Sequence, residues 1–97
     1  MPRVIWTETA REDLVSIREY IAEENPSAAR RVAGRIREAV NKLTDQPRLG
    51  RPVSHHEVRK LTISGFPYVV YYLHHESADA VFVVRVMHDA RQVGRPE

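Results

Sequence analysis

The sequence contains no cysteine among its 97 residues. That absence excludes a disulfide framework, thiolate catalysis and a zinc site built on thiolates. Lysine is nearly absent as well: only Lys42 and Lys60 occur, while arginine supplies the other thirteen of fifteen basic residues. No stretch approaches the roughly 18 apolar residues of a membrane span, and the N-terminus lacks a run of signal-peptide length. The chain is therefore expected to be cytoplasmic, with no membrane contact.

What the chain does have is the composition of a globular protein, with 42% hydrophobic and 29% charged residues and a net charge of +2. Its length suits a single domain spanning residues 1–97. A domain this small buries only about two thirds of its unfolded surface, so a partner that covers leftover apolar surface would stabilise it. Arginine suits bidentate contact with carboxylates or phosphates, but a high-GC genome explains the excess equally well.

Two amphipathic helices are predicted in the N-terminal half, where apolar residues recur with helical spacing. Thr9 as N-cap and Glu12 three residues later fit a capping box, and Thr7 is a rival N-cap. Asn25 and Pro26 suit the N-cap and first position of the second helix. The apolar positions expected to hold this helical hairpin to the rest of the fold are Leu14, Ile17, Val32, Ile36 and Val40.

Strand patterns occupy residues 3–6 and most of the C-terminal half. Residues 45–54 carry two prolines and a glycine and are expected to form an irregular loop. Segments rich in β-branched and aromatic residues follow at 57–63, 67–74 and 80–88. The expected fold class is α+β, a helical hairpin packed on a mostly antiparallel four-stranded sheet in the order β-α-α-β-β-β.

The last predicted strand carries charged groups within its apolar run. Strand alternation places Val81, Val83, Arg85 and Met87 on one side and His88 on the other. Arg85 and His88 are therefore not expected to share a face unless the strand bends or bulges.

Two further patterns have simple structural interpretations. The triplet His-His-Glu occurs at 55–57 and again at 74–76, but adjacent residues of a strand point to opposite faces, so metal binding is not expected. The outward arginines of the second helix, Arg30, Arg35 and Arg37 among them, most simply form a solvated face. Binding of a partner is the alternative for that face.

The order and spacing of several motifs resemble the RelE/ParE superfamily of bacterial type II toxins, and within it the ParE-type branch. These motifs span most of the chain. They are VIW at 4–6, ARxDLxxIxxYI at 10–21, NPSAARR at 25–31, LTDQPRLGRP at 43–52, VRKLTI at 58–63, PYVVYY at 67–72 and VVRVMHDARQ at 83–92.

The resemblance implies a toxin held inactive by a cognate antitoxin encoded beside it. A ParD-like antitoxin of the ribbon-helix-helix kind would contact operator DNA, and the toxin would reach that DNA only through it. The ParE-type branch implies poisoning of DNA gyrase without catalysis, and hence no cofactor or metal. The RelE-type branch implies the alternative, a metal-independent endoribonuclease that cleaves mRNA on the ribosome. A member that has lost toxicity and serves only as a regulatory partner is a third possibility.

Residue chemistry and the resemblance together indicate Arg59, Arg85, His88 and Arg91 as the surface that binds the antitoxin or the target. In a ribonuclease, His88 would be the general acid or base, and Arg59 and Arg85 would stabilise the phosphorane. Arg59 and Arg85 fall where the nuclease branch carries strand arginines. A net charge of +2 gives little support for binding ribosomal RNA. More simply, His88 terminates its strand and bonds nearby backbone.

Arg85 raises a separate question because burying an unpaired charge is costly. Its candidate partners are Asp89, Glu57 and carboxylates of the antitoxin. A structural or antitoxin-binding role is favoured over phosphate binding.

Overall fold

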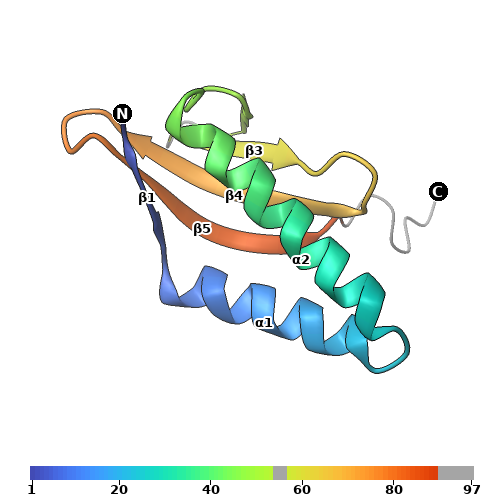
Figure 1. The fold of residues 1–97 in the computed structure, drawn as a ribbon. Coiled ribbons are helices and arrows are strands. Elements are labelled where there is room, and N and C mark those ends of the chain that lie inside the picture. Colours follow the sequence, from blue (N-terminus) through green and yellow to red (C-terminus); the bar gives the residue numbers. More distant parts are fainter. Residues whose placement is uncertain (54–56, 90–97) are drawn as a thin grey trace.

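The computed structural model describes residues 1–53 and 57–89, in which two helices pack on a five-stranded sheet (Figure 1). The strand order is β1-β5-β4-β3-β2; β1 pairs with β5 in parallel and the other neighbours are antiparallel. The elements are β1 (Arg3–Trp6), α1 (Glu8–Ala22), α2 (Pro26–Asn41), the 3-10 helix η1 (Lys42–Thr44), β2 (Arg51–Pro52), β3 (Val58–Thr62), β4 (Tyr68–His75) and β5 (Ala80–His88).

The α+β class, the helical hairpin and the mostly antiparallel sheet are confirmed, but the expected count of four strands is one short. Arg51 and Pro52, inside the segment expected to be irregular, pair with Lys60 and Arg59 to form β2. A proline is compatible with this position because an edge strand can spare one ladder hydrogen bond. Among the described residues, no helix is long and apolar enough to cross a membrane.

The caps that begin the two helices were predicted with mixed success. Asn25 is confirmed as the N-cap of α2, since its side chain accepts a hydrogen bond from Ala28 N at 3.0 Å. The prediction of Thr9 as N-cap of α1 is wrong, because Thr9 lies in the first turn and Thr7 is the cap. The Thr7 hydroxyl accepts from Ala10 N at 3.1 Å and donates to the Val83 carbonyl at 2.9 Å. It thus joins the start of α1 to β5.

The core lies between the helices and one face of the sheet. The predicted hairpin contacts are confirmed: four of the five apolar residues are buried, and Ile17 is partly buried against the same cluster. Trp6 also packs against it from β1. The sheet side of the cluster consists of Leu61, Ile63, Tyr68, Val70, Tyr72, Val81, Val83 and Val86.

A β-bulge in β5 overturns the predicted face assignment of that strand. Tyr71 pairs with Arg85 but Tyr72 pairs with Val83, so Val84 is one residue in excess. Val86, only 2% exposed, therefore joins Val81 and Val83 in the core, whereas Arg85 turns to the opposite face. Both faces of β5 are buried or partly buried from Ala80 to Val84, and beyond that point only Val86 is buried.

Candidate functional site

Arg85 forms an ion pair with Asp13 of α1. Its Nε donates to Asp13 Oδ2 at 2.8 Å and its Nη2 donates to Oδ1 at 3.1 Å, a bidentate arrangement. The hydrogen bond and the charge of Asp13 together raise the pKa of Arg85 above its ordinary value. The sequence had suggested Asp89, Glu57 or a carboxylate of the antitoxin as the partner of Arg85, so Asp13 was not predicted.

Asp13 also binds the backbone of β5, and the topology explains why. The pairing of β1 with β5 ends at Trp6 and Val83, so β5 continues past the end of its neighbour. Beyond that point the edge of β5 lies against the start of α1. The hydroxyl of the N-cap Thr7 donates to the Val83 carbonyl at 2.9 Å, and Asp13 Oδ2 accepts from Val86 N at 2.9 Å. Arg85 and the bulge are thereby fixed against the helix.

His88 is the last residue of β5 and lies on the other face of that strand from Arg85. It pairs with Tyr68, and its exposed imidazole meets the edge of that ring, with ring centroids 5.3 Å apart and ring planes at 78°. Burial raises the pKa of the Tyr68 hydroxyl, and the nearby Tyr20 adds to the effect. The imidazole therefore rests on an aromatic side chain at the end of the sheet.

Arg59 anchors the loop that precedes β2. Its Nη1 donates to the Gly50 carbonyl at 2.6 Å. From the neighbouring strand, the buried Tyr72 hydroxyl donates to the Pro47 carbonyl and accepts from Gly50 N, both at 2.8 Å. Burial raises the pKa of Tyr72, opposed by the bond from Gly50 and by the charge of Arg59. A Cβ on residue 50 would come within 2.8 Å of the Lys60 carbonyl, so this close approach requires glycine.

Arg59 also lines an open cavity of about 630 Å³ together with Arg48, His74 and Glu76. Arg48 Nη2 lies 2.6 Å from Glu76 Oε2, and both side chains are mostly exposed. The cavity thus mixes cations with carboxylates. Within residues 1–53 and 57–89, no group of three or more histidines or acidic residues could hold a metal ion.

The three described residues of the predicted surface, Arg59, Arg85 and His88, do not lie together. Arg59 pairs with Tyr72 and shares the helix-covered face, whereas Arg85 is two strands away on the opposite face. His88 lies on the helix-covered side but at the end of β5, beside Tyr68. Arg91, like His55 and His56, lies outside the described residues.

Three interacting residues were missed from the sequence: Asp13, Arg48 and Tyr72. Asp13 carried a usable signal, because it lies three residues after Ala10 and four before Ile17, on the face of α1 that packs inward. A carboxylate at such a position needs a buried partner. Tyr72 gave no comparable signal, since its partners are carbonyl and amide groups of a loop.

Comparison with known proteins decides the family. The family model described as "ParE toxin of type II toxin-antitoxin system, parDE" matches residues 4–93. The chain belongs to this family. Among its relatives, the toxin RelE2 of Caulobacter vibrioides is 37% identical over 91 residues, which cover 94% of this chain and 99% of the relative. The putative toxin Y4kP of Sinorhizobium fredii is 36% identical over 90 residues, covering 93% and 91%.

Solved structures agree with this ParE-family assignment. The chromosomal ParDE toxin–antitoxin system from P. aeruginosa matches with a TM-score of 0.78 at 25% identity, covering 91% of this chain and 96% of that one. The intact E. coli RelBE toxin–antitoxin complex matches with a TM-score of 0.68 at 14% identity over 91% and 96%, a likeness of fold alone. This ParE-family protein is thus a type II toxin with the RelE/ParE fold.

Proposed function

We propose that this toxin is neutralised in the cytoplasm by a cognate antitoxin and acts by binding and poisoning DNA gyrase. The family match over residues 4–93 supports the toxin–antitoxin setting. Two of the solved relatives are toxin–antitoxin assemblies, ParDE and RelBE, which supports an antitoxin as the partner. The choice of gyrase follows from the ParE-type branch of the family and from the placement of the predicted catalytic groups.

The placement of Arg85 and His88 carries the preference for a binding mechanism. Cleavage of RNA without a metal requires an acid or base and a stabilising cation at one phosphodiester, each within hydrogen-bond reach of it. Here the Arg85 side chain leaves β5 on the uncovered face and binds Asp13 at the strand edge, whereas His88 leaves β5 on the helix-covered face and rests on Tyr68. A single phosphate does not contact both without a rearrangement of β5. Poisoning of a protein target needs no such convergence.

The test is a supercoiling and DNA-cleavage assay with purified gyrase and the full-length toxin. We expect supercoiling to be inhibited and cleaved DNA to accumulate. Prior mixing with the protein encoded in the reading frame beside the toxin should abolish both effects. Unchanged gyrase activity at a large molar excess of toxin would contradict the proposal.

A ribosome-dependent mRNA interferase is the second candidate, favoured by the toxin RelE2 relative at 37% identity. It predicts cuts in mRNA within a purified translation system and no effect on gyrase. His88→Ala separates the mechanisms further, because a nuclease that uses this imidazole would lose most of its cleavage rate. A gyrase poison should retain DNA cleavage in the same variant.

A further inference from the structure

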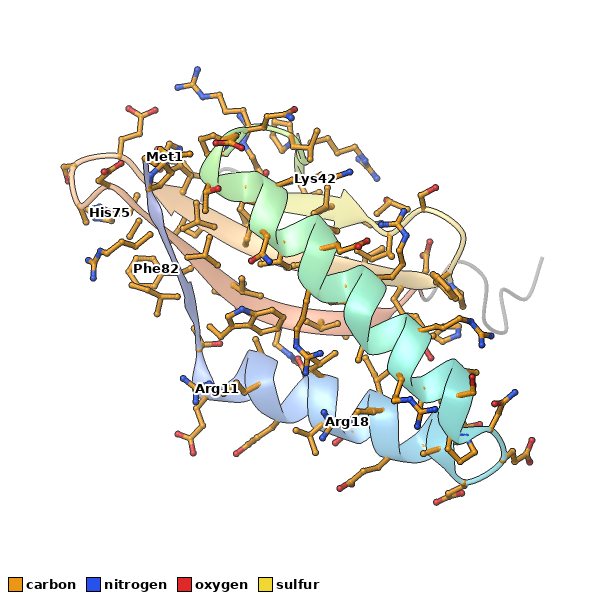
Figure 2. The ribbon with its side chains drawn as sticks, in the orientation of Figure 1. Met1, Arg11, Arg18, Lys42, His75 and Phe82 are labelled. Atoms are coloured by element: carbon orange, nitrogen blue, oxygen red, sulfur yellow. The ribbon has the colours of Figure 1, made fainter. Side chains whose placement is uncertain are left out.

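The open cavity beside Arg59 lies at one corner of the sheet, where the start of β3, the end of β4 and the loop before β2 meet. Its volume of about 630 Å³ is within the range of sites for small ligands, roughly 300–1,000 Å³. Figure 2 labels His75, which marks the end of the sheet where β4 turns towards β5. We call it the Arg59 cavity, and its charged and histidine lining consists of Arg48, Arg59, Glu57, His74, His75 and Glu76.

The lining of the Arg59 cavity is almost entirely polar. Within the described chain, Pro52 is its one apolar residue, and no phenylalanine, tyrosine or tryptophan lines it. Glu57 ends the first His-His-Glu triplet of the sequence and residues 74–76 form the second, so the fold brings parts of both to one place. An apolar ligand or the apolar face of a protein partner would gain little here, because burial of apolar surface drives their binding. A small hydrophilic ligand fits better.

Arg48 and Arg59 bring two guanidinium groups to this cavity. Arg59 Nη1 donates to the Gly50 carbonyl at 2.6 Å and lies 3.4 Å from the Arg48 carbonyl, so the Arg59 guanidinium is held beside the backbone of Arg48. Both contacts use Nη1, and a guanidinium has further N–H groups on Nε and Nη2. Adjoining guanidinium groups with such planar sets of donors are suited to the oxygens of a phosphate.

The Glu76 carboxylate already pairs with one of these arginines. Arg48 Nη2 lies 2.6 Å from Glu76 Oε2, and the two side chains are 70% and 65% exposed. An exposed ion pair of this kind contributes little to stability, so it can open at small cost. A second cavity, of about 590 Å³, shares Arg48, His74 and Glu76 with the first, so the pair lies between two open spaces. The carboxylate thus occupies the place at Arg48 that a phosphate of a ligand would take.

Glu57 and His75 add hydrogen-bonding groups for the rest of a ligand. His75 Nδ1 accepts from Ala78 N at 3.2 Å, which fixes the ring and leaves the proton of the neutral imidazole on Nε2. Glu57 has a φ of 66°, a left-handed conformation that is uncommon outside glycine and is concentrated at functional sites. A carboxylate near a phosphate site can accept hydrogen bonds from the hydroxyls of a ribose.

We propose that the Arg59 cavity binds a small phosphorylated sugar, either free or as the ribose phosphate of a mononucleotide. Its phosphate displaces the Glu76 carboxylate from Arg48 and bonds the adjoining Arg59, while Glu57 accepts from its hydroxyls. A base receives no stacking partner from the described lining, so the sugar phosphate is the part that is recognised. The proposal does not depend on which target the toxin poisons.

The ligand class is tested by isothermal titration of the purified full-length chain with ribose 5-phosphate, adenosine 5′-monophosphate and inorganic phosphate. Ribose 5-phosphate should bind at least about tenfold more tightly than inorganic phosphate, and the nucleotide within about threefold of the sugar phosphate. Equal binding of inorganic phosphate would reveal a plain cationic patch and overturn the proposal. Binding of the nucleotide without the sugar phosphate, or much tighter binding of a short RNA, would overturn it as well.

Substitution of each member of the Arg48–Glu76 pair should change the affinity in opposite directions. Arg48→Gln should weaken binding of ribose 5-phosphate about tenfold or more, whereas Glu76→Gln, which removes the competing carboxylate, should strengthen it about threefold. A merely structural ion pair would shift both variants the same way, and that result would contradict the proposal. If Arg48→Gln does not fold, as judged by circular dichroism, the sign of the Glu76→Gln change decides. The ion pair Arg35–Glu38 of α2, outside this cavity, is the matched control, and neutralising either member should change affinity less than about twofold.

Glu57→Gly tests the contact with the hydroxyls, because glycine adopts a φ of 66° without strain. Binding of ribose 5-phosphate should weaken towards that of inorganic phosphate, while inorganic phosphate should bind as well as before or better, since a nearby negative charge is gone. Equal losses for both ligands, or no loss for the sugar phosphate, would refute the assignment of Glu57 and with it the sugar as the ligand.

Discussion

At the scale of single residues, Asp13 is the first candidate for mutation, because its one carboxylate binds both the Arg85 guanidinium and the backbone N–H of Val86. Its side chain is only 15% exposed. Asp13→Ala removes these bonds and leaves Val86 N without its acceptor. We expect the free energy of unfolding to fall by roughly 1.5–3 kcal/mol, as for hydrogen bonds to charged groups. Urea denaturation measures this loss.

Asn at position 13 is the informative control for that substitution. Its carbonyl oxygen can still accept from Val86 N, but it does not carry the charge that Arg85 pairs with. Asp13→Asn should therefore be less destabilising than Asp13→Ala, and Arg85→Ala, at a more exposed side chain, should cost least. If Arg85→Ala were the most damaging of the three, the backbone contact of Asp13 would not be its main role.

Tyr72 gives a second residue-scale prediction, with a pH dependence. Tyr72→Phe loses the bonds to Pro47 and Gly50 and leaves Gly50 N unpaired, which costs roughly 1–3 kcal/mol. Amide exchange at Leu49 and Gly50 should accelerate, because the loop loses its anchor. Tyr68→Phe is the matched control, another buried tyrosine of β4 that does not hold this loop.

At alkaline pH, the free energy of unfolding should depend on ionisation of the same Tyr72 hydroxyl. Since the pKa of Tyr72 is raised above 10.0 in the folded state, the unfolded chain loses this proton first. The stabilisation is complete below about pH 10 and is lost as pH rises through the folded pKa. Tyr72→Phe should therefore show a shallower decline above that pH than the wild type. An unchanged slope would mean that other groups dominate alkaline unfolding.

At the scale of elements, the two threonines before and within α1 form a natural test pair. Thr7→Ala removes the N-cap and the bond to Val83, with an expected loss of about 1–2 kcal/mol. Thr9→Ala should change stability by less than about 0.5 kcal/mol, because Thr9 is exposed within the first turn. Thr7→Ser retains the hydroxyl and should recover most of the loss. Thermal unfolding of the three variants would compare them directly.

The periodicity of the sequence was enough to predict both helices and the four longer strands, because helix and strand periods differ plainly in this chain. It was not enough to predict β2, because two residues are too few to show a period. They pair with Lys60 and Arg59, and the loop before them is held by the side chains of Tyr72 and Arg59. The periodicity also did not predict the β-bulge at Val84 in β5. It lies beside a tertiary contact that the sequence does not reveal, in which Asp13 accepts a hydrogen bond from the amide of Val86.

Prediction of the candidate site is limited in the same way, because its contacts join separate elements of the fold. Residue types and motif spacing indicated Arg59 and Arg85, and both form specific contacts. The partner of Arg85, Asp13, lies 72 residues away in a helix, and the partner of Arg59, Gly50, belongs to an irregular loop 9 residues away, so no helix or strand period predicts either contact. A groove between α2 and β3 likewise brings Arg35 and Lys42 close to Arg51 and Lys60 only once the helix has packed on the sheet.

At the scale of the whole molecule, one cluster joins α1, α2, β3, β4 and β5, while β1 brings the N-terminus alongside the C-terminal strand. No part of the described fold has a core of its own. We therefore expect the helices and the sheet to unfold together. Trp6, the only tryptophan, reports on β1 by fluorescence, and far-ultraviolet circular dichroism reports on the helices.

Ile36→Ala is the decisive variant for this cooperativity. Ile36 is fully buried at the centre of α2, so its truncation should cost about 2–5 kcal/mol, a large part of the roughly 5–15 kcal/mol typical of a domain. If the fold is one unit, the fluorescence and dichroism transitions shift by the same amount and stay coincident, even though Trp6 belongs to β1 and Ile36 to α2. Should the helical signal melt first while Trp6 fluorescence persists, β1 and β5 would form a separately stable unit. In that case, α1 could detach from the edge of β5 without unfolding the sheet, and the fixed separation of Arg85 and His88 would no longer argue against catalysis.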